Sequence, residues 1–317
     1  MLEICEPALI TSLQDFGRFG YQRFGVPSSG PMDWFAHHAA NVLVKNYSGE
    51  ACLEVGLTSA AFKVTKDCLI AVTGAGYVLA INQVPQSLWT SHWYSAGYTL
   101  TLSKQPGGNW AYLAVGGGFQ TECLLNSSST YLKAGLGHNL QQGEKLALKG
   151  TDKNTHQWAG RTLPTGKRLA YMDKVVIRAL PGLHTSRFTP EGLNAFWNDS
   201  YSVTTNSDRM GYRLQGETIT HTKGADIVSQ GMVLGTVQVP ADGQPIVMMP
   251  DHPTTGGYTQ IAVVAKADLP LIAQSEAGVG RVQFKKVTLE ESHLLYTDLL
   301  ANLKHGIIDN MEDWMLL

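Results

Sequence analysis

The residues best suited to chemistry gather in one short stretch. Positions 235–258 read GTVQVPADGQPIVMMPDHPTTGGY, and Asp251, His252, Thr254 and Thr255 place a carboxylate, an imidazole and two hydroxyls within five positions. An imidazole suits general base catalysis near neutral pH, and the other groups suit the orientation of a water or an amide. The alternative is a structural hairpin corner in which the Thr and Asp side chains satisfy the turn's own amides and an exposed histidine is inert. We predict that these four residues are catalytic.

A second polar loop spans positions 14–33 and is rich in glycine. Gln14, Asp15, Arg18, Ser29 and Asp33 are candidate substrate-binding residues. A guanidinium can fork onto a carboxylate or phosphate, although Arg18 could instead pair with Asp15 across the turn. Asp33 precedes an apolar helical pattern, so it could equally complement the helix dipole.

Further candidates lie outside these two loops. The stretch NSSSTYLKAGLG at 126–137 offers Lys133, with a solvated loop as the alternative. The predicted substrate-binding set is completed by Arg209, Ser229, Gln244 and Gly256.

Short strands must position most of these groups. Between about residues 50 and 150 the chain alternates apolar runs such as LIAVTGAG and WAYLAVGGG with Gly, Asn or Pro, which is typical of a barrel or sandwich. Residues 150–168 are polar and rich in turn formers, so we predict a boundary there. The expected fold is mainly β, with a first domain at 1–160 and a second at 161–317 that ends in a helix. RFGYQ at 18–22 resembles RMGYR at 209–213, which suggests a diffuse internal duplication.

Three helices are expected at the periphery. Pro31 suits a first helical turn after Ser29 or Gly30 as cap, and this helix should end near residue 46. A short helix is predicted at 190–197 with Thr189 as cap. Thr288 and Glu291 form a capping box that opens the last helix.

Composition excludes several classes of protein. The net charge is −2 with no basic run, which argues against nucleic acid and anionic membrane as partners. No window reaches 18 apolar residues, the first residues lack a signal-peptide pattern, and the four cysteines are scattered, so we expect a cytoplasmic protein. No GxxxxGK[ST] loop occurs, so the chain alone is not expected to hydrolyse ATP.

Two long motifs and two shorter ones resemble those of a known family. The motifs are QDFGRFGYQRFGVPSSGPMD from Gln14, STYLKAGLG from Ser129, NSDRMGYRL from Asn206, and VPADGQPIVMMPDHPTTGGY from Val239. Together they look like the biotin-dependent carboxyltransferase family, which includes the C subunits of bacterial 5-oxoprolinases, also labelled allophanate hydrolase subunit 2 or KipA-like. The match covers roughly residues 5–290. The chain is also similar to part of the carboxyltransferase region of urea carboxylases.

The resemblance implies two cyclophilin-like β-barrel domains. It also implies one subunit of an ATP-dependent amidohydrolase, a 5-oxoprolinase that opens 5-oxo-L-proline to L-glutamate, with ATP as co-substrate and the A and B subunits as partners. We expect such a chain to be inactive alone; its metal requirement stays open. The alternatives are a KipA-like regulator that binds a KipI-like kinase inhibitor, and the carboxyltransferase component of a urea carboxylase-type system. Tyr131 and His252-Pro253 depart from the family pattern, which bears on substrate specificity.

Overall fold

The computed structural model describes residues 1–150 and 155–309. The chain forms two compact units that are not contiguous in sequence. Unit 1 comprises Met1–Arg18, Asp33–Leu169 and the residues from Leu300 onward, and unit 2 comprises Phe19–Met32 and Ala170–Leu299. The units therefore differ from the predicted segments 1–160 and 161–317 in three places: residues 19–32 count with unit 2, whereas residues 161–169 and those from 300 count with unit 1.

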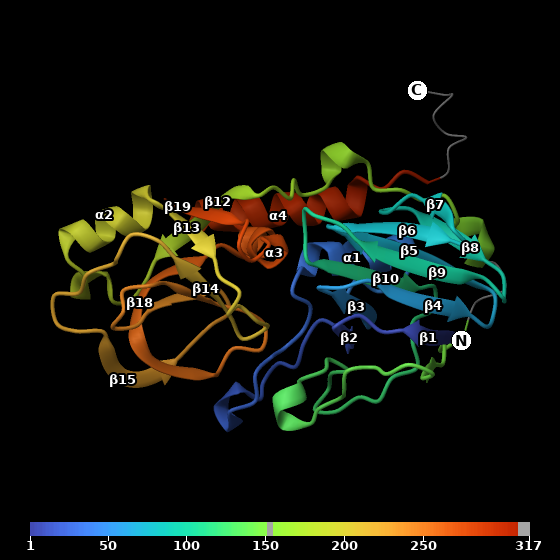
Figure 1. Ribbon diagram of the computed structural model, residues 1–317, viewed down its shortest axis with the longest axis horizontal. Helices are drawn as coiled ribbons and strands as arrows, with labels where there is room; N and C mark the ends of the chain where they lie inside the picture. The colour runs from blue at the N-terminus through green and yellow to red at the C-terminus, as the bar shows by residue number, and fades with distance from the viewer. Residues whose placement is uncertain (151–154, 310–317) are drawn as a thin grey trace. The chain divides into compact units, whose positions relative to one another are not determined.

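Unit 1 is built from two antiparallel sheets (Figure 1). One has the order β11-β1-β4-β9-β6-β7 and the other β2-β3-β10-β5-β8. Their strands are β1 (Leu2–Glu6), β2 (Ile10–Gln14), β3 (Cys52–Gly56), β4 (Ala60–Val64), β5 (Cys68–Gly74), β6 (Tyr77–Ile81), β7 (Val84–Gln86), β8 (Ser91–Tyr94), β9 (Thr99–Lys104), β10 (Trp110–Val115) and β11 (Lys145–Leu146).

One hydrophobic core joins these sheets. Phe62 and Leu100 of the first sheet belong to the same buried cluster as Ile70 and Leu113 of the second. Strand β4 alternates buried and less buried positions, as expected of a strand with one face on a core. Strands β3, β5 and β10 are buried at every position, which fits the continuous apolar runs in their sequence.

Helix α1 (Trp34–Leu43) packs on the second sheet of unit 1. Its contacts are chiefly with β5 and β10, and Thr73 Oγ1 donates to the Ala36 carbonyl at 2.6 Å. The helix begins at Trp34 with Asp33 as N-cap, not at Pro31. The predicted start was therefore wrong by one turn, because the Asp33 carboxylate satisfies the Ala36 amide at 2.9 Å and the preceding residues turn away.

Unit 2 is organised by a closed barrel. Seven strands follow the order β12-β19-β13-β14-β17-β16-β18, and the pairing of β12 with β18 closes the ring. Strand β15 adds to β18 at the side. The strands are β12 (Lys174–Pro181), β13 (Ser200–Val203), β14 (Gly211–Gln215), β15 (Asp226–Gly231), β16 (Thr236–Val239), β17 (Ile246–Met248), β18 (Thr255–Val264) and β19 (Arg281–Lys286).

Helices lie outside the strands, as predicted. Helix α2 (Pro190–Asn198) is capped by Thr189, whose hydroxyl accepts from the Gly192 amide at 3.0 Å. Helix α4 (Leu289–His305) opens with the reciprocal Thr288–Glu291 box, at 2.7 and 3.2 Å. Helix α3 (Leu269–Gln274) was not predicted; it is short and begins with a Leu-Pro pair.

The mainly β fold class with peripheral helices is confirmed. Of the two predicted cyclophilin-like barrels, unit 2 contains a closed seven-stranded barrel, and unit 1 consists of two antiparallel sheets around one core. The proposed repeat fares differently, because RMGYR enters strand β14 whereas RFGYQ lies in a loop and a short 3-10 helix at Gln22–Phe24. None of the described helices is long and apolar enough to cross a membrane.

Candidate functional site

A buried ion pair anchors the most concentrated polar site, which lies in unit 2. Arg209, just before β14, donates from Nε to Asp251 Oδ2 at 2.8 Å and from Nη2 to Asp251 Oδ1 at 3.1 Å. Both side chains are about 10% exposed, so the fork is shielded from solvent. A bidentate guanidinium–carboxylate contact fixes direction as well as distance.

The same guanidinium holds the glycine-rich segment that enters from the N-terminal part of the chain. Arg209 Nη2 also donates to the Gly30 carbonyl at 2.7 Å, and the Ser29 amide donates to the Pro250 carbonyl at 3.1 Å. The loops around 29–30, 209 and 250–252 are thus assembled into one structure. Sequence reasoning chose Ser29, Arg209 and Asp251, but it missed the backbone carbonyls of Gly30 and Pro250, which no residue-type pattern marks.

Ser29 has two features typical of a functional position. Its φ of +54° lies in the left-handed region, which costs about 1–3 kcal/mol for a residue other than glycine. Its Oγ is buried and makes no hydrogen bond to any described residue. A buried hydroxyl without a partner is uncommon, so a ligand atom is a natural acceptor or donor for it.

His252 is buried, and its two ring nitrogens have different roles. Its Nδ1 lies 2.7 Å from the Pro253 carbonyl, which can only accept, so Nδ1 carries the proton. Nε2 then holds the lone pair, and it has no hydrogen bond to a described residue. Burial lowers the pKa of His252 below its ordinary value of 6.5, against the opposing effects of the Pro253 carbonyl and the Asp251 charge. The imidazole is therefore neutral at neutral pH and can accept a proton at Nε2.

His252 is not an exposed turn residue, because it is only 4% exposed. Its amide donates to the Met249 carbonyl at 2.9 Å within the turn.

The remaining members of the 251–257 motif begin strand β18. Thr254 contributes its carbonyl to the Met232 amide at 3.0 Å, and Thr255 pairs with Gly231 and is exposed. A Cβ on Gly256 would lie 2.5 Å from both Gln238 Nε2 and Met232 Sδ, so a larger residue there would require these two side chains to move. Within this motif Asp251 thus forms the ion pair and His252 follows it in a buried turn, whereas Thr255 and Gly256 begin β18 directly after Thr254.

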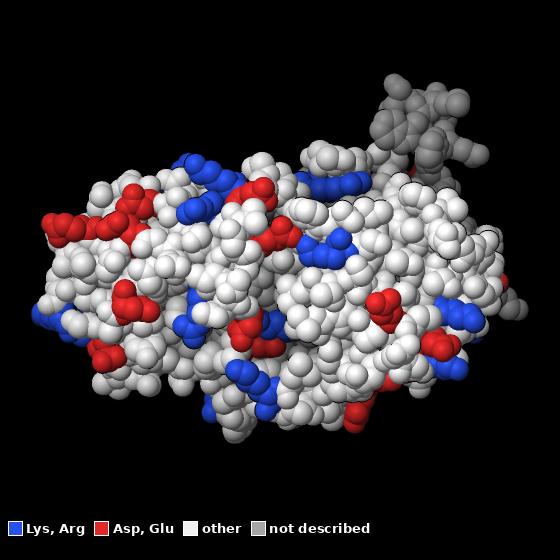
Figure 2. Space-filling view, viewed as in Figure 1, with Lys and Arg blue, Asp and Glu red and all other residues white. Residues whose placement is uncertain are grey.

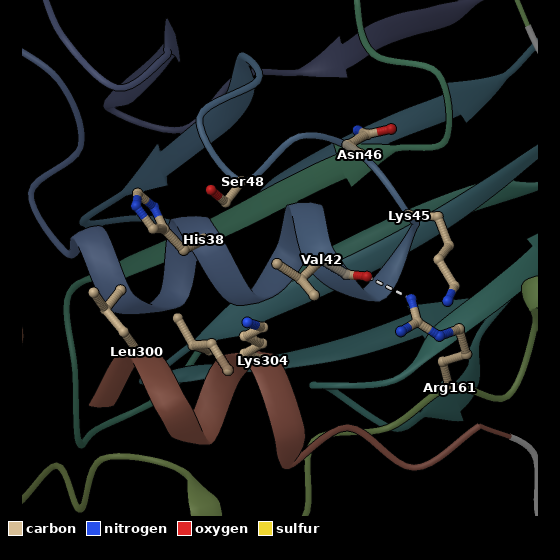
Figure 3. A pocket seen from close by; sticks show the side chains of 9 residues that line it. His38, Val42, Lys45, Asn46, Ser48, Arg161, Leu300 and Lys304 are labelled. Carbon is tan, nitrogen blue, oxygen red and sulfur yellow. Dashed lines mark hydrogen bonds between the residues drawn. The ribbon is translucent and has the colours of Figure 1, made fainter. Parts of the chain in front are cut away.

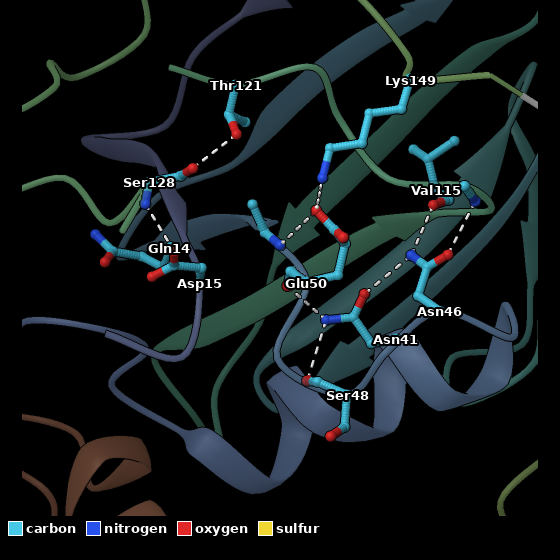
Figure 4. Close-up of polar contacts among 12 residues, drawn as sticks. Gln14, Asp15, Asn41, Asn46, Ser48, Glu50, Val115, Thr121, Ser128 and Lys149 are labelled. Carbon is cyan, nitrogen blue, oxygen red and sulfur yellow. Dashed lines mark hydrogen bonds and ion pairs between the residues drawn. The ribbon is translucent and has the colours of Figure 1, made fainter. Parts of the chain in front are cut away.

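A second cluster lies in unit 1 around Asp15. Its carboxylate accepts from the Ser127 and Ser129 hydroxyls at 2.6 Å each and from the Gly17 amide at 2.9 Å. It also accepts from the Ser128 amide at 2.7 Å (Figure 4). Burial would raise the pKa of Asp15, but these hydrogen bonds outweigh it and hold the pKa below the ordinary value. Within the 126–137 stretch, Ser127 and Ser129 are thus buried, whereas residues 132–135, Lys133 among them, are exposed as the solvated-loop alternative supposed.

Gln14 and Arg18 belong to the same cluster and are almost fully buried. Arg18 donates to the carbonyls of Leu124 and Ser129 at 3.1 and 2.8 Å. Gln14 donates from its side chain to the Thr130 carbonyl at 3.2 Å, and its backbone carbonyl receives His37 Nε2–H at 2.9 Å. These contacts tie the start of the glycine-rich loop to the 124–130 loop.

His37 is a buried polar residue that the sequence reasoning missed. Burial lowers its pKa to about 4. The adjacent pair His37-His38, set within a predicted apolar helical stripe, was the available signal.

The other predicted residues are dispersed. Asp33 caps α1, and Gln244 clamps the Gly216 amide and carbonyl at 2.8 and 3.3 Å. Ser229 and Lys133 are exposed, the latter on a 3-10 turn at Leu132–Ala134. No described group of three or more His, Cys, Asp or Glu residues could hold a metal ion. On the face shown in Figure 2, basic and acidic side chains are interspersed.

Comparison with known proteins gives a consistent assignment. The model of the carboxyltransferase domain, subdomains A and B, matches residues 24–286. The chain is 35% identical to the C subunit of 5-oxoprolinase from Escherichia coli K12 over 300 residues, which is 92% of this chain and 93% of that protein. It is 34% identical to the protein of the same name from Haemophilus influenzae over 296 residues, again 92% and 93%.

A solved structure shows the same fold within a longer chain. The Kluyveromyces lactis urea carboxylase superposes with a TM-score of 0.87 at 26% identity, covering 98% of this chain and 30% of that one. The chain belongs to the carboxyltransferase domain family of subdomains A and B, the biotin-dependent carboxyltransferase family that includes the C subunits of bacterial 5-oxoprolinases.

Proposed function

We propose that this protein is the C subunit of an ATP-dependent 5-oxoprolinase that opens 5-oxo-L-proline to L-glutamate together with the A and B subunits. The observation that carries the proposal is the similarity over 92% of the chain to two bacterial proteins of that name. The site in unit 2 supports it, because a neutral imidazole and a buried hydroxyl meet the needs of lactam opening.

The chemistry follows from the stability of the amide. Resonance makes the lactam carbonyl a poor electrophile, and transfer of the ATP γ-phosphoryl group to its oxygen creates a leaving group. Water then attacks the carbonyl carbon and the ring C–N bond breaks, with a proton going to the ring nitrogen, which leaves an acyl phosphate. A second water hydrolyses this acyl phosphate to the carboxylate and inorganic phosphate. In this scheme His252 Nε2 takes a proton from the first water, and Ser29 Oγ hydrogen-bonds a polar atom of the substrate. The lowered pKa of the buried imidazole and the buried hydroxyl without a described partner support these roles.

The Arg209–Asp251 pair has a positioning role in this scheme. Each charge is already neutralised by the other, so the pair holds Gly30 and the 250–252 turn in place instead of binding an anion. ATP is assigned to the assembled complex, since the chain carries no Walker loop.

The test is reconstitution with the A-like and B-like subunits, following glutamate and phosphate release. We expect no turnover by this chain alone and stable co-purification with its B-like partner. His252→Asn should lower kcat about 10²–10⁴-fold, the usual contribution of a general base, because Asn keeps a donor for the Pro253 carbonyl but has no basic nitrogen. His293→Asn on the exposed face of α4 is the matched control. Steady turnover by the single chain, or full activity of the His252→Asn complex, would refute the respective part.

A second function is favoured by the family model and by the urea carboxylase structure. A carboxyltransferase would move a carboxyl group from biotin, which requires a separate carboxylase and biotin carrier, because this chain has no Met-Lys-Met biotinylation stretch. Avidin separates the two functions: it blocks biotin-dependent transfer and leaves 5-oxoproline opening untouched. A stable complex without turnover on either substrate would instead leave the regulatory binding role.

A further inference from the structure

Unit 1 contains a pocket that the proposed reaction does not use. It has a volume of about 510 Å³, within the range typical of small-molecule sites, and is formed where the end of α1 faces the last turns of α4 (Figure 3). Its lining includes the side chains of His38, Val42, Lys45, Arg161, Leu300 and Lys304.

The lining is basic and partly apolar. Three cationic side chains border the pocket and no carboxylate of a described residue does. Val42 and Leu300 supply an apolar wall, and Figure 3 shows Lys45 and Arg161 at one end with His38 at the other.

Arg161 is held in place by the protein itself. Its Nη1 donates to the carbonyls of Val42 and Leu43 at the end of α1, and its Nε pairs with Asp309. The side chain is 7% exposed, so its position is fixed and its charge is compensated by the carboxylate.

The two lysines differ, because their charge is not compensated by any described acidic residue. Lys45 lies over the Trp158 ring at 4.3 Å, which orients its ammonium group without neutralising it. Lys304 lies in the last turn of α4 and has no ion pair with a described residue. Two uncompensated ammonium groups beside an apolar wall are complementary to an anionic head on an apolar body.

We propose that this pocket binds a small organic oxyanion, a carboxylate or phosphate ester whose apolar part lies against Val42 and Leu300. The competing explanation is that each lysine only complements the partial negative charge at a helix C-terminus. The two explanations predict different responses to anions, and neither depends on the 5-oxoprolinase reaction.

The experiment is calorimetric titration of the full chain with hexanoate, phenyl phosphate and inorganic phosphate, with sodium chloride and hexanol as controls. Hexanoate or phenyl phosphate should bind saturably and more tightly than inorganic phosphate, and the ratio of the first two tells whether carboxylate or phosphate is preferred. Lys45→Gln and Lys304→Gln should each weaken binding about tenfold or more, as expected for loss of a charge-assisted contact. Lys66→Gln, an exposed lysine of the same unit, should leave it unchanged.

Three results would overturn the proposal. One is heat that does not saturate or that sodium chloride reproduces. Another is binding that survives in the Lys45→Gln, Lys304→Gln double variant. The third is a double variant that melts earlier while the wild type shows no stabilisation by any of the anions, which would assign the lysines to the helix ends alone.

Discussion

At the scale of single residues, breaking the Arg209–Asp251 ion pair should strongly reduce the stability of the fold. Both groups are buried, so Asp251→Asn leaves a guanidinium charge without its counter-ion. We expect a loss of about 3–5 kcal/mol in the free energy of unfolding. Urea unfolding followed by circular dichroism measures it.

A paired replacement is the control. Arg209→Met with Asp251→Leu removes both charges together, and the double variant should be less destabilised than Asp251→Asn alone. Wild-type stability of Asp251→Asn would mean that the pair does not contribute to folding. Since the single variant loses both structure and charge, the activity of Asp251→Asn must be read together with its stability.

His37 predicts a pH dependence of unit 1. Its folded-state pKa of about 4 lies below the unfolded value of 6.5, so the unfolded chain binds the proton more tightly. The contribution to stability is complete above pH 6.5 and is lost as the pH falls toward 4. The depression corresponds to roughly 3 kcal/mol at 1.36 kcal/mol per pKa unit.

The comparison variant is His37→Gln, whose amide can still donate to the Gln14 carbonyl. Unfolding free energies of both proteins between pH 7 and 4 should diverge in slope, with the wild type steeper. Parallel curves would show that His37 does not titrate in this window.

The side chains of the candidate site could be selected from residue types, but the hydrogen bonds that join them could not. Asp251 and His252 stood out because so many polar groups occupied one turn. Arg209 reaches Asp251 across 42 positions and Gly30 across 179, and the acceptor at Gly30 is a backbone carbonyl. The residue types in a sequence do not show which backbone carbonyl will accept a hydrogen bond from a distant side chain.

At the scale of elements, the start of α1 gives a direct test. Asp33→Ala removes the acceptor for the Ala36 amide and should cost about 0.5–2 kcal/mol. Asp33→Asn preserves an N-cap oxygen and should stay near wild type in both stability and activity. Thermal unfolding of the two variants decides it; equal losses would mean that the charge of Asp33, not its cap, is what matters.

The elements also show where local patterns suffice. Thr189 and the Thr288–Glu291 box were recognised because a cap acts over three residues. Pro31 also matched a local pattern for the start of a helix. The helix nevertheless begins after Asp33, whose carboxylate accepts the free amide of Ala36. The barrel closure between β12 and β18 joins strands far apart in sequence, so no local pattern could predict it.

At the scale of the molecule, the interleaving of the units predicts that simple halves will fold poorly. Expressed separately, 1–160 and 161–317 should give aggregated or protease-sensitive products, because unit 2 would lose the Ser29–Pro250 and Arg209–Gly30 bonds. Co-expression of the two halves should recover folded material. Limited proteolysis with mass spectrometry measures this, and two independently resistant halves would contradict it.

The contact between Gly30 and Arg209 can form only late in the synthesis of the chain. The two residues are separated by 179 positions, so a ribosome adding about 5–20 residues per second needs roughly 10 to 40 seconds between them. During that interval the nascent 19–32 segment lacks Arg209 and Pro250, with which it forms hydrogen bonds in the folded protein. It carries Phe19 and Phe24, which stay 57% and 66% exposed even in the folded chain, so the growing polypeptide presents two exposed aromatic side chains to chaperones before Arg209, the donor to Gly30, has been translated.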